Sequence, residues 1–143
     1  MVSGFGKIDC ALYNLGMSKT GSQIESTDFV KGIARDIQGE GVDFLRGAIK
    51  FLYKYLDFRE LDESNLKEEA RIRWKRTADQ VLRDKYVYKP KSCTDLVITF
   101  QALCEAKGCT TRFIKLTRVE GRGIHSMAEV KLPDGWYLVD IGG

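Results

Sequence analysis

Apolar residues recur at helical spacing through the first half of the chain. A Ser-Thr pair precedes a predicted helix over residues 27–37, and two glycines follow it. A second helix is predicted over 42–56, and a charged, mostly helical stretch over 62–85. Residues 1–24 are rich in glycine and are predicted to be irregular, with at most one short strand. The apolar positions behind these predictions are Phe29, Val30, Ile33, Ala34, Ile37, Phe44, Leu45, Ala48, Ile49, Leu52, Tyr55, Leu56, Leu66, Ala70, Trp74, Ala78, Val81 and Leu82.

The pattern changes after Pro90, which disfavours a helix in the residue before it. A strongly apolar helix is predicted over 92–107, with a glycine directly after it as a natural stop. Strands are then predicted over 111–119, 124–132 and 136–141, the last two joined by a Pro-Asp-Gly turn.

Helices first and antiparallel strands afterwards indicate an α+β fold. The expected arrangement is a set of N-terminal helices, a buried helix, and then an antiparallel β-sheet. With 143 residues, 43% hydrophobic and 30% charged, the chain fits one globular domain over 1–143. We divide it into an irregular segment (1–24), a helical part (25–88) and the part that carries the candidate chemistry (89–143).

No membrane segment is expected. The longest uncharged stretches, residues 10–18 and 96–104, are too short for a spanning helix, which needs about 20 apolar residues. The first ten residues lack the basic-then-apolar layout of a signal peptide, so a cytoplasmic location is expected.

The counts of cysteine and histidine restrict the possible metal chemistry. The chain has four cysteines and a single histidine, which excludes sites that need two histidines. No CxxC pair is present, and a zinc site would have to combine Cys93, Cys104, Cys109 and His125 at unusual spacings. We therefore expect neither a metal nor another cofactor.

The net charge is +3, and its excess lies before Cys93. Its densest part is the run from Arg71 to Arg76, which includes a tryptophan and could grip a phosphate backbone. The alternative is a solvated helix face, supported by Glu68 and Glu69 one turn away. Because nucleic-acid-binding domains usually carry more excess charge, we favour the solvated face.

One cysteine stands at the predicted entrance of a helix. Ser92 is placed to cap this helix, Asp95 completes a variant of the capping box, and Cys93 is the first helical residue. The free N–H groups and the helix dipole there favour a thiolate. A buried cysteine is nevertheless often only a small hydrophobe, which is how we interpret Cys104 and Cys109.

A thiol nucleophile needs a base, and the base needs a group that orients it. His125 begins one predicted strand and Asp140 ends the next. A four-residue turn would place Lys131 opposite Trp136 and Asp140 opposite Met127, on the same face as His125 and within its reach. A three-residue turn would put them on opposite faces, so the triad requires the first register.

The segment 92–143 resembles the core of the transglutaminase-like superfamily, a papain-like cysteine-enzyme fold. The family pattern has a Cys at a helix start, an Arg-bearing strand, a His followed by Glu, and a Gly-Trp turn that leads to Asp. The matching residues are Cys93, Gly108, Arg112, His125, Glu129, Gly135, Trp136 and Asp140. The helices before residue 89 are similar to the family's N-terminal helices, though only the last third of the chain is specific. Ser92, Met127 and Ile141 replace the usual Gly, aromatic residue and Pro.

The resemblance implies a cysteine-dependent hydrolase of amide, peptide or isopeptide bonds that acts through a thioester on a protein or peptide substrate. Cys93 would be the nucleophile, His125 the base and then the acid, and Asp140 the orienting residue. The Cys93 N–H would supply part of an oxyanion hole. The second donor is not fixed by the pattern, with Gln80, Tyr86 and Tyr88 as candidates. Protein cross-linking by acyl transfer through the same triad, and a non-catalytic protein- or nucleic-acid-binding module on the same fold, stay open as alternatives.

Overall fold

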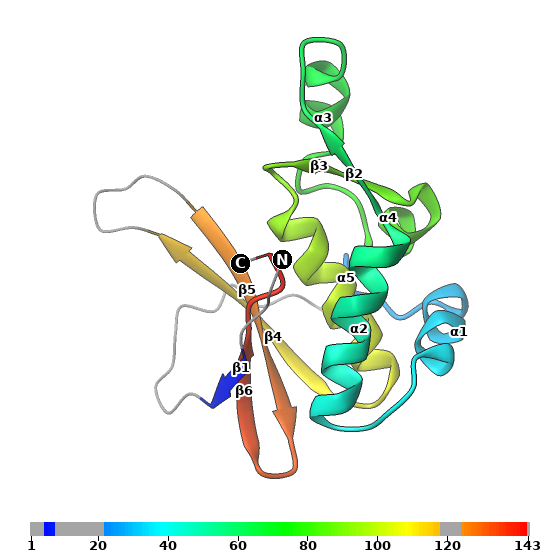
Figure 1. Cartoon of the computed structure of the whole chain (residues 1–143), viewed down its shortest axis with the longest axis vertical. Coiled ribbons are helices and arrows are strands. Elements are labelled where there is room, and N and C mark those ends of the chain that lie inside the picture. Colours follow the sequence, from blue (N-terminus) through cyan, green and yellow to red (C-terminus); the bar gives the residue numbers. More distant parts are fainter. Residues whose placement is uncertain (1–4, 8–21, 118–123, 143) are drawn as a thin grey trace.

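The computed structural model describes residues 5–7, 22–117 and 124–142 (Figure 1). In chain order, the elements are β1 (Phe5–Lys7), α1 (Asp28–Asp36), α2 (Val42–Tyr55), β2 (Asp57–Glu60), α3 (Leu66–Ile72), α4 (Ala78–Asp84), β3 (Tyr86–Lys89), α5 (Cys93–Ala106), β4 (Thr110–Thr117), β5 (Ile124–Leu132) and β6 (Gly135–Val139). The predicted α+β class is confirmed, with mixed helices and an antiparallel sheet.

The main sheet has the strand order β1-β6-β5-β4, with antiparallel neighbours throughout. The three C-terminal strands lie where the alternation predicts them, and β1 is the one short strand expected in the N-terminal segment. The predicted end of the first strand, at residues 118–119, lies outside the described residues. Gly135, at φ 138°, closes the turn between β5 and β6 in a conformation that L side chains rarely adopt.

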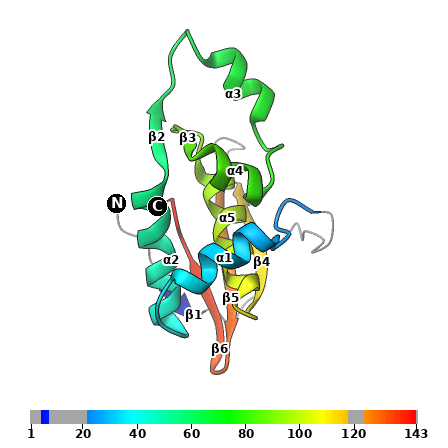
Figure 2. The ribbon, with the colours of Figure 1, turned by 90° about the vertical axis from the view of Figure 1, so that its right-hand side faces the viewer.

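Helix α5 lies between the sheet and the other helices. It packs against β4 and β5 on one side and against α1, α2 and α4 on the other (Figure 2). Eleven of its residues are buried, which explains why its sequence is apolar almost all round. The helix ends as predicted, because Gly108 follows it at φ 89°.

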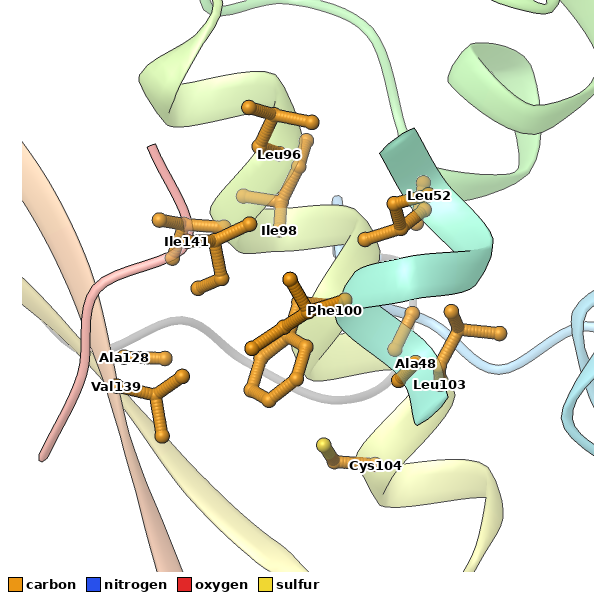
Figure 3. Packing of buried hydrophobic residues seen from close by; sticks show 14 of the residues in the cluster. Ala48, Leu52, Leu96, Ile98, Phe100, Leu103, Cys104, Ala128, Val139 and Ile141 are labelled. Carbon is orange, nitrogen blue, oxygen red and sulfur yellow. The ribbon is translucent and has the colours of Figure 1, made fainter. Parts of the chain in front are cut away.

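One hydrophobic cluster joins these layers. Figure 3 shows Ile141, which follows β6, beside Leu96 and Ile98 of α5, with Phe100 nearer to Val139 of the sheet. Ile141 is fully buried, although a Pro is usual there in the family that the sequence resembles. The chain after β6 is therefore anchored against the helix that begins at Cys93.

The segment predicted to be mostly helical over 62–85 differs from the prediction. It forms two short helices, α3 and α4, separated by a turn in which Trp74 has the left-handed φ of 60°. Helix α4 begins afresh at Thr77, whose hydroxyl and the Gln80 side chain form a reciprocal capping box. The helix breaks because Arg76 turns into the protein to reach Asp95.

Two short strands flank this segment and were not predicted. β2 and β3 pair in parallel, with Asp57 opposite Tyr86 and Glu60 opposite Lys89. Each has four residues and mixed burial, so its sequence carries little strand periodicity.

The predicted cap of α5 is wrong. Ser92 has helical backbone angles and makes no side-chain capping bond. Asp95, expected to take part in that cap, is buried and instead accepts a hydrogen bond of 2.8 Å from Arg76. The entrance of α5 is thus held by a tertiary ion pair.

None of the helices within the described residues is long and apolar enough to cross a bilayer.

Candidate active site

The β5–β6 hairpin brings His125 and Asp140 together. Its register pairs Lys131 with Trp136, which confirms the four-residue turn predicted from the sequence. Asp140 follows the last paired residue and carries its carboxylate to the imidazole, with His125 Nε2 and Asp140 Oδ1 2.8 Å apart. Both side chains are about one-third exposed. Because Asp140 Oδ1 contacts Nε2, the other ring nitrogen, Nδ1, is not engaged in this contact.

Tyr53 of α2 fixes the chain on the far side of Asp140. Its hydroxyl donates a hydrogen bond of 2.6 Å to the carbonyl of the buried Ile141. Burial raises the pKa of Tyr53, and the nearby charge of Asp140 raises it further. The phenol therefore stays protonated and keeps its donor role at neutral pH. Asp140 is held between this anchor and the β5–β6 ladder.

Cys93 is the first residue of α5, as predicted, and is partly exposed. The chain after Asp140 passes over it: a Cβ added to Gly142 would lie 3.6 Å from Cys93 Cβ. The hydroxyls of Thr94 and Ser126, the neighbours of Cys93 and His125, share a hydrogen bond of 3.2 Å. Cys93 is therefore joined to His125 through the neighbouring Thr94 and Ser126, and it lies close to Gly142, two residues after Asp140.

The thiol itself is not bonded to the imidazole. The structure places no hydrogen bond between Cys93 and His125, both of which are described. The hydrogen bond that joins this part of β5 to the first turn of α5 comes from Ser126, the next residue along the strand. The structure thus joins His125 to Asp140 and brings Cys93 to the same end of the sheet without closing the triad.

A cavity of about 330 Å³ opens beside Cys93. Four segments line it: the turn after α3, the loop before α5, the first turn of α5, and β4. The lining residues are Arg73, Trp74, Pro90, Lys91, Cys93, Thr94 and Lys115. Arg73 and Trp74 belong to the basic run that the sequence offers as a possible phosphate site. Pro90, Lys91, Thr94 and Lys115 carry no such signal, because the four segments come together only in the folded chain.

The other described cysteines are poorly suited to nucleophilic chemistry. Cys104 is fully buried, and burial raises its pKa well above the ordinary value. Burial also raises the pKa of Cys109, and the charge of Glu105 adds to this shift. Cys10 lies outside the described residues. Among the described residues, no group of histidine, cysteine and carboxylate side chains could hold a metal ion.

Three residues of the family-like pattern form a cluster on the sheet. Glu129 is 2% exposed and faces Arg112, whose Nε lies 3.5 Å from its Oε1. The Arg112 guanidinium also stacks over the Trp136 ring, 3.6 Å from its centre. The cluster spans β4, β5 and β6 on the face that His125 shares with Glu129, and it supports the strand that carries His125.

The three candidates for a second oxyanion donor are engaged elsewhere. The Gln80 side chain accepts from the Thr77 N–H in the capping box. The hydroxyls of Tyr86 and Tyr88 both donate to Glu68 of α3. The two tyrosine contacts tie β3 to α3, and the Gln80 contact caps α4, so the three residues serve structural contacts.

The basic run from Arg71 to Arg76 is not one solvated helix face. Arg71 is exposed, Arg73 pairs with the buried Glu69, and Arg76 is only 4% exposed. Arg76 contacts the Tyr86 carbonyl and Asp84 besides Asp95. Within the run, Arg71 is therefore exposed to solvent, Arg73 lines the cavity, and Arg76 is buried.

The family model of the transglutaminase-like superfamily matches residues 31–141. The chain belongs to this superfamily. The match includes Cys93, His125 and Asp140, and it runs from within α1 through α2, α3 and α4 to the C-terminal core. No curated protein matches the sequence.

A solved structure from Cytophaga hutchinsonii, described as a candidate cysteine protease, has the same fold. The TM-score is 0.58 at 14% identity, over 90% of this chain and 40% of the other. At that identity the likeness supports a cysteine-protease-like fold. The chain spans less than half the length of that relative.

Proposed function

We propose that the protein is a cysteine hydrolase of amide, peptide or isopeptide bonds, with Cys93 as nucleophile, His125 as base and Asp140 as the orienting group. The observation that carries the proposal is the 2.8 Å contact between His125 and Asp140 at the end of the sheet where α5 begins with Cys93. Membership of the transglutaminase-like superfamily supports it.

In the first half of the reaction, Cys93 Sγ attacks the carbonyl carbon while its proton passes to His125 Nδ1. Asp140 holds the ring through Nε2 and stabilises the imidazolium. The first N–H groups of α5 have no acceptor within the helix, so they can bind the oxyanion. The C–N bond then breaks, His125 protonates the leaving amine, and a thioester remains on Cys93.

In the second half, His125 takes a proton from water, which attacks the thioester, and the C–S bond breaks to release the acid and restore the thiol. An amine in place of water would give acyl transfer with the same groups. The attack requires Cys93 and His125 to approach each other more closely than in the free protein. Such contacts are often loose before substrate binds.

p-Nitrophenyl acetate tests the proposal without a known substrate. Cys93 should take up the acetyl group and release p-nitrophenolate, with a second, slower phase as the thioester hydrolyses. Asp140→Asn should slow acylation by about 10²–10⁴-fold, because the imidazole loses its orienting carboxylate. The matched control is Asp134→Asn, which changes an exposed carboxylate in the turn of the same hairpin. Adding a primary amine distinguishes hydrolysis from acyl transfer by the product formed.

Iodoacetamide gives an independent measurement. Cys93 should be alkylated faster than Cys104 and Cys109, and His125→Ala should remove this advantage. Equal, slow reaction of the described thiols in the parent protein would contradict the enzyme and support a non-catalytic binding module.

A further inference from the structure

The cavity beside Cys93 has an unusual charge. Three of its seven lining residues are cationic and none carries a carboxylate. Arg73 is compensated by Glu69, to which its Nε donates at 2.8 Å. Within the described chain, no carboxylate lies within ion-pair distance of Lys91 or Lys115. The charge of Lys91 also acts on Glu69, the carboxylate that pairs with Arg73. The three cationic side chains therefore give the cavity next to the thiol a net positive charge.

The cavity also exposes an aromatic ring. Trp74 is the most exposed large hydrophobic residue among the described residues, with 55% of its surface accessible. Its backbone has a φ of 60°, which is costly for a residue with a Cβ. Lys115 Nζ lies 5.0 Å from the centre of its ring. An indole kept at the mouth of a cavity in this conformation offers an apolar wall for a ligand.

Both the size and the layout of the cavity limit the ligand. A volume of about 330 Å³ is at the lower end of ordinary ligand sites, enough for a short segment of a peptide. A nucleic-acid strand is usually bound along a groove in which cations follow successive phosphates. Here the cations come from three separate segments and converge on one cavity, beside the residue proposed to attack an amide.

We propose that this cavity is a specificity site for an acidic side chain adjacent to the scissile bond. In this site Lys115 and Lys91 bind the carboxylate, and Trp74 packs against the neighbouring part of the peptide. This inference rests on the proposed function, since it names the class of substrate for the same site. It assigns the tryptophan and its basic neighbours a role in choosing the substrate.

The charge of the cavity can be measured without turnover. Iodoacetate and iodoacetamide alkylate the same thiol and differ in charge. Peptide mapping measures both rates at Cys93. Their ratio, divided by the same ratio in the urea-unfolded chain, reports the local electrostatic potential. The ratio should favour iodoacetate in the parent protein and fall about two- to fivefold in Lys115→Gln, since a unit charge a few ångströms away acts with this strength in water. Lys131→Gln, an exposed lysine on β5 outside the cavity, is the matched control and should leave it unchanged.

Salt gives a second readout on the same samples. Raising the salt concentration should reduce the preference for iodoacetate in the parent and have little effect in Lys115→Gln. A normalised ratio that does not favour iodoacetate, or that Lys131→Gln lowers as much as Lys115→Gln, would overturn the inference whatever the enzymatic result.

Substrate preference is tested with peptide amides that differ only in glutamate or glutamine beside the scissile bond. The parent should prefer glutamate in kcat/KM, and in Lys115→Gln the ratio of kcat/KM for the two peptides should fall toward one. Turnover of both peptides without preference would refute the acidic site and leave the hydrolase standing. An alkylation preference without turnover of any peptide would refute the hydrolase and leave the charged cavity. Protection of Cys93 by a short oligonucleotide, but not by the glutamate peptide, would overturn the proposal in favour of nucleic acid.

Discussion

Replacing Arg76 by methionine should destabilise the protein strongly at neutral pH. Arg76 and Asp95 are 5% and 10% exposed in their side chains and form a pair with a 2.8 Å contact. Removing one member of such a buried pair leaves an uncompensated charge and typically costs about 3–5 kcal/mol. Arg76 also donates to the Tyr86 carbonyl at 3.0 Å, so the upper half of this range is expected.

The dependence on pH separates this mechanism from a simple packing defect. In the parent protein burial raises the pKa of Asp95, while the hydrogen bond and charge of Arg76 oppose the shift. Without Arg76 the folded-state pKa rises further above its unfolded value of about 3.9. A raised acid pKa means that stability is lost as pH rises through the folded-state value, so the deficit of Arg76→Met should be smaller at pH ~5 than at pH ~7.

The assay is urea unfolding followed by far-ultraviolet circular dichroism at both pH values. In the double variant Arg76→Met/Asp95→Leu, most of the loss should be recovered, because an apolar pair of similar volume avoids the buried charge. Arg83→Met breaks the more exposed pair with Asp79 and should cost at most about 1 kcal/mol. A loss below about 1 kcal/mol for Arg76→Met at neutral pH, or a deficit independent of pH that Asp95→Leu does not relieve, would refute the argument.

Two further predictions concern the core and the partly buried thiol of Cys109. Ile141→Ala should lower the free energy of unfolding by about 2–5 kcal/mol in the same assay, whereas Ile141→Val should cost about 0.5–1.5 kcal/mol, because Ile141 is fully buried against α5; similar losses for both variants would contradict this. Iodoacetamide should alkylate Cys109 only at higher pH in the folded protein than in the urea-unfolded chain, because burial and the charge of Glu105 raise the pKa of its thiol. Glu105→Gln should move the pH profile of alkylation toward lower pH. Identical profiles for the folded and unfolded chains would count against the pKa shift.

The features that could be predicted from the sequence depend on short-range rules. The contact between His125 and Asp140 follows from the length of one turn, because the register of a hairpin decides which side chains share a face. The position of Cys93 follows from the apolar run after Pro90 and the glycine that ends the helix. In each case, local information fixed the geometry.

The errors arose where distant segments compete with local patterns. The apolar spacing through Leu66, Trp74 and Ala78 is that of a single helix, yet Arg76 finds a better partner in Asp95 and breaks it. The parallel strands β2 and β3 pair although α3 and α4 lie between them in the sequence. The four residues of each strand carry no pattern from which this pairing could be predicted. The predicted cap at Ser92 is wrong for a related reason, because Asp95 accepts a hydrogen bond from the distant Arg76 instead.

The same long-range contacts separate the two roles that we assign to the site. His125 and Asp140 are placed by the β5–β6 hairpin and anchored through Tyr53, whereas the cavity wall depends on the turn between α3 and α4. The Arg76–Asp95 pair ties that turn to the first turn of α5, and so to Cys93. Changes at Lys115 should therefore alter the choice of substrate without affecting the His125–Asp140 contact. Changes at Arg76 should disturb both the cavity and the thiol, because one ion pair positions them together.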